Sequence, residues 1–166
     1  RGGGAFLDTA GAAPGGGAFP SLPRGRPVYN THTRHLVSAT RFVVTHAMLY
    51  RTTGEARYQA GMRHALTFLR TAFLDPVTGG YAWLIDWQDG RATTQDATRH
   101  CYGMAFVMLA YARAYQAGVP EARAWLADAF DTAEQHFWQP AAGLYADDTD
   151  TACSSPAAGA RPPTCT

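Results

Sequence analysis

Arg41 lies in the middle of a predicted helical segment of mostly apolar residues, and it is the residue best suited to chemistry. Arg41 lies within residues 34–50, whose other positions are mostly apolar. A guanidinium is rarely buried without a specific partner or a water-filled cavity. In a cavity it would bind a carbonyl or hydroxyl oxygen and stabilise the negative charge that develops there during proton abstraction. Alternatively, Arg41 extends its charged end into solvent or pairs with a loop acid, Asp86 or Asp96.

Two tryptophans lie in a segment of alternating aromatic and aliphatic residues. The segment GGYAWLIDW contains Trp83 and Trp87 and is followed by the turn-forming sequence Gln88-Asp89-Gly90. This pattern predicts a β-hairpin. The flat apolar face of an indole suits the C–H face of a sugar ring, so either tryptophan is a candidate for sugar binding. A structural role, in which both tryptophans fix the hairpin to the helices, explains the pattern equally well.

Histidines and acids offer a second kind of chemistry, because imidazole titrates near neutral pH. We expect most of the six histidines to be structural; His46 and His100 are the better placed. A buried or capping role is still the more frequent explanation for both. Asp147, Asp148 and Asp150 are more typical of a solvated loop than of a catalytic carboxylate pair. The sequence has no Ser/His/Asp order, phosphate-binding loop or HExxH motif.

Four helical segments must position these residues. Apolar positions cover more than one face of residues 34–50 and 102–115, which predicts helices buried on two sides. Residues 55–73 and 121–137 each carry one apolar stripe with polar residues opposite, which predicts helices with a solvent-exposed face. Residues 1–29 form a leading segment rich in Gly, Ala and Pro, a composition that does not propagate a helix.

The two helix pairs are copies of one unit. Six pairs of identical residues are separated by the same offset of 64: Phe42 and Phe106, Gly54 and Gly118, Phe73 and Phe137, Pro76 and Pro140, Gly79 and Gly143, and Tyr81 and Tyr145. Pairs with one doubly buried and one singly buried helix are typical of a toroid of inner and outer helices.

We therefore predict an all-α fold, an incomplete (α/α)6 toroid of helical hairpins with a short β-hairpin loop. Residues 30–150 would form a partial barrel domain of two helix-pair repeats. At this repeat length a closed ring of six pairs would need roughly 380 residues. A four-helix bundle is the alternative, although long loops after each pair fit a bundle poorly.

Composition and charge exclude several classes of protein. The net charge of +1 arises from interspersed signs without a basic run, so we expect no binding to nucleic acid or to an anionic membrane. No apolar stretch approaches the roughly 20 residues of a membrane span, and the leading segment lacks the features of a signal peptide. We predict a cytoplasmic protein whose three cysteines form neither a disulfide framework nor a metal site.

Three strings in order resemble the N-acylglucosamine 2-epimerase family, in particular its mannose isomerase-like branch. They are HLVSATRFVVTHAMLYRTTG, DPVTGGYAWLIDWQDG and HCYGMAFVMLAYARAY, and the similarity runs from about Arg34 to Asp150. The resemblance implies an (α/α)6 barrel with its active site at the mouth of the central cavity. It also implies a small-molecule sugar substrate and no metal or other cofactor.

The resemblance also assigns roles to individual residues. Arg41 in the TRF string matches the family's substrate-oxygen arginine, Tyr102 in HCYG matches its cavity tyrosine, and Phe106 falls on a wall position beside the sugar. Trp83 is a weaker match for a sugar-binding position. In the family, two histidines act as acid and base and move a proton at the carbon beside the sugar carbonyl, through an enediol-type intermediate. Neither histidine is expected among residues 1–150.

Residues 151–166 form an irregular tail in which we suspect a frameshift. By resemblance, an RGQNANMH-like helix with one catalytic histidine should begin nearby, whereas the chain has ACSSPAAGARPPTCT. In a shifted reading frame, each new codon consists of the third base of one codon and the first two bases of the next. In that frame the codons of residues 158–166 can encode RGQ, then T or A, then ANMH. The DNA sequence across residues 150–166 tests this hypothesis, because an in-frame codon series without the alternative would contradict it.

The predicted function is that of a fragment of a sugar isomerase or epimerase, catalytically incomplete by itself. Its parent would interconvert mannose and fructose or epimerise a related aldose at carbon 2. One alternative is a glycoside hydrolase or lyase on the same barrel, which would need positioned carboxylates. Another is a non-enzymatic helical-repeat binding module, which would leave Arg41 exposed. The sequence does not predict the oligomeric state.

Overall fold

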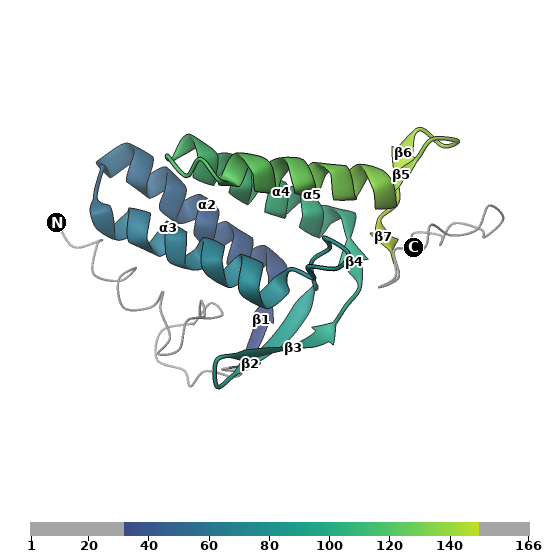
Figure 1. Ribbon diagram of the computed structural model, residues 1–166, viewed down its shortest axis with the longest axis horizontal. Helices are drawn as coiled ribbons and strands as arrows, with labels where there is room; N and C mark the ends of the chain where they lie inside the picture. Colours follow the sequence, from purple (N-terminus) through teal and green to yellow (C-terminus); the bar gives the residue numbers. More distant parts are fainter. Residues whose placement is uncertain (1–31, 150–166) are drawn as a thin grey trace, which may run out of the picture.

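The computed structural model describes residues 32–149 and contains two helical hairpins in that range. The first hairpin consists of α2 (Leu36–Thr53) and α3 (Ala56–Phe68), and the second of α4 (Cys101–Gln116) and α5 (Ala122–His136). The main contacts between helices join α2 to α3, α2 to α4, and α4 to α5, so α2 and α4 form the inner layer. Figure 1 shows the hairpins side by side, with the strands gathered at the end where α2 and α4 begin. The predicted helix pairs are confirmed.

Two parts of the chain lie outside the described residues. They are the leading segment of residues 1–29 and the tail of residues 151–166. The frameshift hypothesis concerns this tail and stays a prediction. None of the described helices is long and apolar enough to cross a membrane.

Residues at the helix ends explain where the helices begin and stop. His35 is the N-cap of α2, and its Nδ1 accepts a hydrogen bond from the backbone N–H of Val37 at 3.2 Å. Gly54 ends α2 with φ at 70° and donates its N–H to the Tyr50 carbonyl at 2.8 Å. This left-handed conformation costs glycine little, which is why glycine commonly terminates helices. After α4, Ala117 is the C-cap and the next residue, Gly118, takes the left-handed conformation with φ at 88°.

The second predicted helix, residues 55–73, differs from the structure in its last turn. It divides into α3 and a π-helical turn, η1 (Leu69–Phe73). Leu69 and Phe73 are both buried, so the wider turn keeps two large side chains in the core. A π turn of this kind replaces the usual hydrogen-bond spacing and cannot be recognised from an apolar stripe alone.

The repeat extends to the backbone hydrogen bonds of the loops after α3 and α5. Gly79 donates to the Asp75 carbonyl and Gly143 to the Gln139 carbonyl, each at 2.9 Å. The bonds from Ala82 to Phe73 and from Ala146 to Phe137 are likewise 64 residues apart, at 3.0 and 2.7 Å. Leu74 and Tyr81 form an antiparallel β-bridge, and the residues 64 positions later, Trp138 and Tyr145, are paired in the same antiparallel way. The repeated residues therefore build the same loop twice.

A small antiparallel sheet contains the predicted hairpin. Its strands are β1 (Thr33–His35), β2 (Leu84–Gln88) and β3 (Arg91–Asp96), in the order β1-β2-β3. The turn between β2 and β3 has positive φ at Asp89 (50°) and Gly90 (76°), as a tight hairpin turn requires. The hairpin is confirmed, whereas the addition of β1 was not predicted.

Two shorter strand pairs complete the described structure. Strand β4 (Arg99–His100) pairs with β7 (Asp148–Thr149), and β5 (Trp138–Gln139) pairs with β6 (Leu144–Tyr145). The β4–β7 pair joins the start of α4 to the last described residues.

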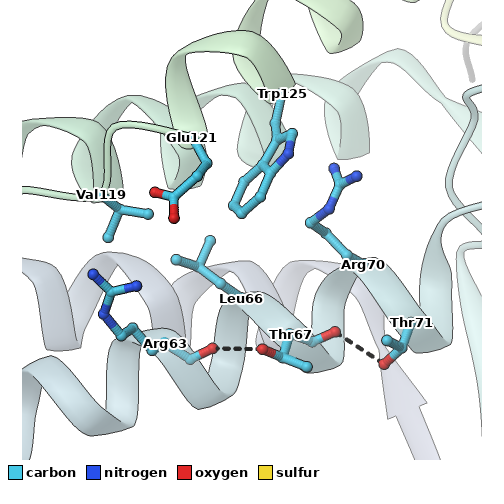
Figure 2. A pocket seen from close by; sticks show the side chains of 8 residues that line it. All are labelled: Arg63, Leu66, Thr67, Arg70, Thr71, Val119, Glu121 and Trp125. Atoms are coloured by element: carbon cyan, nitrogen blue, oxygen red, sulfur yellow. Dashed lines mark hydrogen bonds between the residues drawn. The ribbon is translucent and has the colours of Figure 1, made fainter.

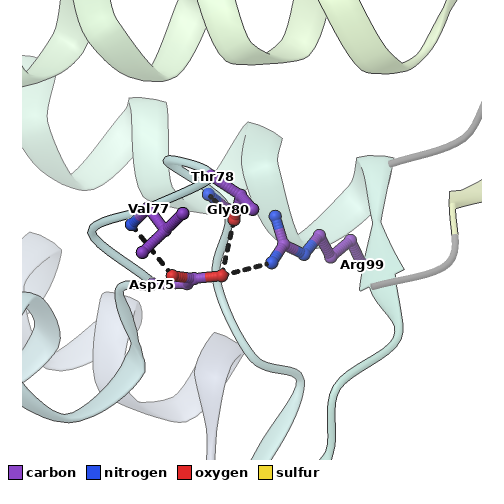
Figure 3. A network of polar contacts seen from close by, with 5 residues as sticks. All are labelled: Asp75, Val77, Thr78, Gly80 and Arg99. Atoms are coloured by element: carbon purple, nitrogen blue, oxygen red, sulfur yellow. Dashed lines mark hydrogen bonds and ion pairs between the residues drawn. The ribbon is translucent and has the colours of Figure 1, made fainter. Parts of the chain in front are cut away.

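A polar network fixes the loop after α3 to the start of α4. Both side-chain oxygens of Asp75 accept hydrogen bonds, from the Val77 N–H at 3.0 Å, the Thr78 hydroxyl at 2.7 Å and the Arg99 guanidinium at 2.9 Å (Figure 3). Arg99 passes so close to Gly80 that a Cβ there would lie 1.9 Å from its Nη1. The Thr78 hydroxyl contributes most to lowering the pKa of Asp75, followed by the Val77 N–H and Arg99.

The hydrophobic core lies between the layers and is continuous across both hairpins. Val43 of α2, Met62 of α3, and Val107 and Tyr111 of α4 have no exposed surface. Burial of side chains of this size stabilises the fold by about 1.5–3 kcal/mol each. The buried hydroxyls of Tyr81 and Tyr111 satisfy one another at 2.6 Å.

The sequence predicted that the inner helices α2 and α4 are buried on two sides. In the described residues, one side of each helix is exposed. Among the described residues, nothing covers a stripe of α2 and α4. Its exposed members are Ser38, Arg41, Thr45 and Met48 on α2, and Tyr102, Ala105 and Leu109 on α4. The apolar composition of these helices was interpreted as burial, but part of it faces outward on this stripe.

Candidate active site

Three of the four predicted site residues meet on the inner helices: Arg41 and Tyr102 lie on the exposed stripe, and the half-buried Phe106 lies between them. The Arg41 guanidinium lies over the ring of Phe106, 5.3 Å from its centroid. The Tyr102 ring meets the same phenylalanine edge to face, with centroids 4.9 Å apart. A cation held over an aromatic face is attracted by the ring quadrupole. Arg41 is thus placed from α2 against two aromatic side chains of α4.

Trp83 lies nearby, between two histidines. Its ring centroid is 4.3 Å from that of His35 and 4.1 Å from that of His100. The residues come from three places, because His35 ends β1, Trp83 precedes β2 and His100 ends β4. The hairpin loop therefore holds its tryptophan where α2 and α4 begin.

A glycine permits this arrangement. A Cβ at Gly103 would lie 2.9 Å from Cδ2 of Leu36 and 3.3 Å from Cζ3 of Trp83. The Trp83 carbonyl also accepts a hydrogen bond from the Leu36 N–H at 3.0 Å. Trp83 is thus bound to the start of α2 through its backbone and packed on α4 through its ring, which gives it a structural role; its role in sugar binding stays a prediction.

The surroundings of His35 favour its neutral form. Burial lowers the pKa of His35 first, and the positive potential of His100 and Arg41 lowers it further. The effect of Arg41 connects the Arg41–Phe106–Tyr102 group with the histidine–tryptophan group. A neutral His35 also suits its N-cap role, in which Nδ1 must accept a hydrogen bond.

His100 and Asp148 form a contact that sequence reasoning missed. Nδ1 of His100 meets a carboxylate oxygen of Asp148 across the β4–β7 pair. The interpretation of Asp148 as a loop residue in solvent was therefore incomplete, although its side chain is still 55% exposed. This pairing could not be predicted from the sequence, because each strand is only two residues long and His100 and Asp148 are 48 residues apart.

The Arg41 side chain is exposed, whereas its position in a mostly apolar helix suggested that it is buried. Within residues 32–149, no ion pair joins it to Asp86 or Asp96. Tyr102 is also open, with 57% of its surface exposed. In the same range no three His, Cys, Asp or Glu side chains gather as a metal site would require. The group can bind an oxygen-rich, partly apolar molecule through one cation and several aromatic faces.

The two helical hairpins, with α2 and α4 inside and α3 and α5 outside, form a segment of an (α/α)6-barrel protein. The sequence matches the N-acylglucosamine 2-epimerase (GlcNAc 2-epimerase) family over residues 17–163, and the chain belongs to that family. The resemblance found in the sequence is confirmed.

Individual relatives agree with this assignment. The D-mannose isomerase of Marinomonas mediterranea is 42% identical over 135 residues, which are 81% of this chain and 33% of the relative. A crystal structure of a D-mannose isomerase matches with a TM-score of 0.82 at 40% identity, covering 91% of this chain and 37% of that one.

A more distant structure shows how widely the fold is shared. The cellobiose 2-epimerase of Bacillus thermoamylovorans matches with a TM-score of 0.81 at 18% identity, covering 92% of this chain and 39% of the other. At this identity only the fold is comparable. This chain spans about a third of the length of the curated relative at 42% identity.

Proposed function

We propose that this chain forms one part of the sugar-binding site of an aldose–ketose isomerase acting on mannose and fructose, or of a related 2-epimerase. Arg41 binds the oxygen at the reacting end of the sugar, Tyr102 supplies a hydroxyl, and Phe106 and Trp83 offer apolar faces to the ring. The observation that supports this most directly is the Arg41 guanidinium over Phe106 with Tyr102 beside it. The identity to a D-mannose isomerase supports the choice of sugar.

The proposed reaction moves a proton at the carbon next to the carbonyl. As that proton leaves, electron density shifts onto the carbonyl oxygen, and the Arg41 guanidinium stabilises the negative charge there. An acid and a base are also required, and by family resemblance these histidines come from outside residues 1–150. His35 is occupied as an N-cap and His100 contacts Asp148. We therefore propose that the chain alone binds sugar without converting it.

A chimera tests the enzyme proposal. Residues 32–149 of this chain would replace the homologous third of the Marinomonas mediterranea D-mannose isomerase, and conversion of mannose to fructose would be assayed. We expect a folded, active chimera in which Arg41→Ala lowers kcat/KM roughly 10²–10³-fold, as is typical when one charge-stabilising donor is removed. Thr45→Ala, one turn further along the same stripe, serves as the matched control and should retain full activity.

Two outcomes would overturn the role of Arg41. One is an Arg41→Ala chimera that keeps the activity of the parent chimera. The other is an equal loss of activity in Thr45→Ala, which would attribute the effect to the helix face as a whole. Circular dichroism and thermal melting of each variant separate lost chemistry from lost folding.

A non-enzymatic binding module is the second candidate, and one observation favours it. That alternative predicts an exposed Arg41, which is what the described residues have. The chimera distinguishes the two functions. A binding module would yield a folded chimera without isomerase activity, whereas the enzyme proposal expects turnover that depends on Arg41. The cytoplasmic location and the absence of a cofactor stay predictions.

A further inference from the structure

The backbone and the ring of Trp83 are held by different parts of the chain. Its backbone N–H donates to the Asp96 carbonyl, and its carbonyl accepts from the Leu36 N–H, each at 3.0 Å. These bonds fix the position of the backbone but not the side-chain torsions, because a side chain can adopt several staggered rotamers on one backbone. The direction of the indole therefore depends on the side chains around it.

Two histidines and a glycine surround the Trp83 indole. The His35 ring meets it at an interplanar angle of 69° and the His100 ring at 59°. The edge of the indole lies against Gly103, the residue after Tyr102 in α4, where a Cβ would be 3.3 Å from Cζ3. Trp83 is half-buried, so part of its ring stays open. Its direction decides which apolar surface lies beside the turn of α4 that carries Tyr102.

Both histidines are held through Nδ1, but with opposite hydrogen-bonding roles. Nδ1 of His35 accepts a hydrogen bond from the Val37 N–H at 3.2 Å, which joins this ring to the first turn of α2. Nδ1 of His100 meets a carboxylate oxygen of Asp148 in β7. A carboxylate accepts hydrogen bonds, so Nδ1 of His100 must carry a hydrogen. Nδ1 of His35 must carry none.

The two histidines also differ in how far away their hydrogen-bond partner lies in the sequence. The partner of His35 is two residues away, at the start of the same helix. The partner of His100 is Asp148, 48 residues further along the chain. The His100 side chain is 24% exposed, so it has room to rotate once the carboxylate is removed. Asp148 therefore acts on the Trp83 indole through the His100 ring.

We propose that His100 is a positioning residue for Trp83, and that Asp148 holds it in this role. The inference rests on the proposed function, in which Trp83 offers an apolar face to the sugar. An indole already held between His35 and His100 does not have to be ordered when the sugar binds, and such preorganisation increases affinity. The contacts from Asp148 through His100 to Trp83 thus connect strand β7 with the candidate site.

A second tryptophan provides an internal reference for the experiment. Trp125 lies in an outer groove of about 260 Å³ between α3 and α5. Figure 2 shows Leu66 of α3 pointing toward this indole, with Arg70 beside it. The Arg70 guanidinium is 4.4 Å from the ring centroid. Because α3 holds the Trp125 indole, its signals should not change in variants of His100 or Asp148.

Nuclear magnetic resonance of the isotope-labelled 166-residue chain tests the positioning without sugar. In wild type we expect nuclear Overhauser contacts between the Trp83 and His100 rings, and imidazole nitrogen signals that show hydrogen on Nδ1 of His100 but not on Nδ1 of His35. Asp148→Ala should weaken the ring contacts. Asp148→Asn keeps an acceptor oxygen and should preserve them. Ring contacts that are unchanged in Asp148→Ala would overturn the proposal.

Titration of the same variants with D-mannose measures the effect on binding. His100→Ala and Asp148→Ala should raise Kd roughly two- to tenfold, as expected when binding must order one further side chain. Asp148→Asn should bind nearly as tightly as wild type. Glu134→Ala is the matched control, because the Glu134 carboxylate contacts Tyr145 of the neighbouring β5–β6 pair and should not affect Kd.

The outcomes distinguish this proposal from the proposed function. A wild-type chain that does not bind D-mannose contradicts the proposed function, whereas the ring contacts measured without sugar still decide whether His100 positions Trp83. If the wild type binds and neither His100→Ala nor Asp148→Ala changes Kd, the positioning role is wrong. An equal rise in Kd in Glu134→Ala would also overturn it, because the loss would then be general. Circular dichroism and thermal melting confirm that each variant is folded.

Discussion

The two helix pairs of this chain share one backbone plan and differ in what they place on it. The loops after α3 and α5 repeat the same backbone hydrogen bonds at an offset of 64. Yet Asp75 in the first loop binds Arg99, whereas its counterpart in the second is Gln139. Tyr81 is 4% exposed and its counterpart Tyr145 is 45% exposed.

This difference separates two kinds of residue: those shared by both helix pairs, which build the scaffold, and those found in one pair, which lie closer to the candidate site. The shared glycines and phenylalanines fix the turns and the core in both copies. Asp75, which the second copy lacks, lies in the loop that precedes the β2–β3 hairpin, and Trp83 at the start of this hairpin contacts His35 and His100. Paired positions therefore provide matched controls, since the same substitution can be made in a buried and in an exposed copy.

The largest expected effect compares a buried with an exposed phenylalanine. Phe73 is 2% exposed, whereas Phe130 on the outer helix is 51% exposed. Phe73→Ala should lower the free energy of unfolding by about 3–5 kcal/mol, because it removes buried apolar surface and leaves a cavity. Phe130→Ala should change it by less than about 0.5 kcal/mol. Urea unfolding at a concentration where the chain is monomeric measures both, and equal effects would contradict the assigned core.

An intermediate effect is expected from the Asp75 network. Asp75→Asn should lower the free energy of unfolding at pH 7 by about 1–2 kcal/mol, since the partly exposed carboxylate loses charged hydrogen bonds. The pKa of Asp75 is depressed in the folded chain, so its stabilisation is present above the unfolded pKa of about 4 and is lost as the pH falls through the folded value.

Unfolding of wild type and Asp75→Asn as a function of pH tests that sign. The difference between them should shrink as the pH falls below about 4. Gln139→Ala in the second loop is the control and should show no pH-dependent difference, because an amide does not titrate. A wild-type advantage that grew toward low pH would refute the role given to the carboxylate.

The smallest effect concerns the tyrosine pair in the core. Tyr81→Phe removes the hydrogen bond between the buried Tyr81 and Tyr111 hydroxyls and should cost about 1 kcal/mol. Tyr145→Phe, at the matched exposed position, should be close to neutral. Burial, together with the neighbouring hydroxyl, raises the pKa of Tyr81, so the Tyr81 phenol should stay protonated where exposed tyrosines ionise. Ultraviolet difference spectra at high pH, comparing Tyr81→Phe with wild type, check this.

Much of the fold could be predicted because its signals are local. Helical spacing, the terminating glycines and the turn at Asp89–Gly90 depend on residues close in sequence. The repeat also appears directly in the sequence. The strand β1 and the β4–β7 pair could not be predicted, because each depends on segments that meet only after the helices pack.

The proximity of three candidate site residues could be predicted, whereas their surroundings could not. Arg41, Tyr102 and Phe106 lie together because inner helices of consecutive repeats are neighbours, and their roles in a sugar site stay predictions. The exposure of Arg41 could not be deduced, since apolar composition does not say which faces neighbouring helices cover. His35 and His100 beside Trp83 became apparent only from the three-dimensional arrangement.

We propose that the exposed face around Arg41 binds sugar and does not convert it. A titration of the isotope-labelled chain with D-mannose, followed by nuclear magnetic resonance, tests both halves in one sample. We predict shifts of the Trp83 indole and the Arg41 guanidinium signals, an unmoved Trp125 indole in the outer groove, and no formation of fructose. Fructose formation, or shifts confined to Trp125, would contradict the account.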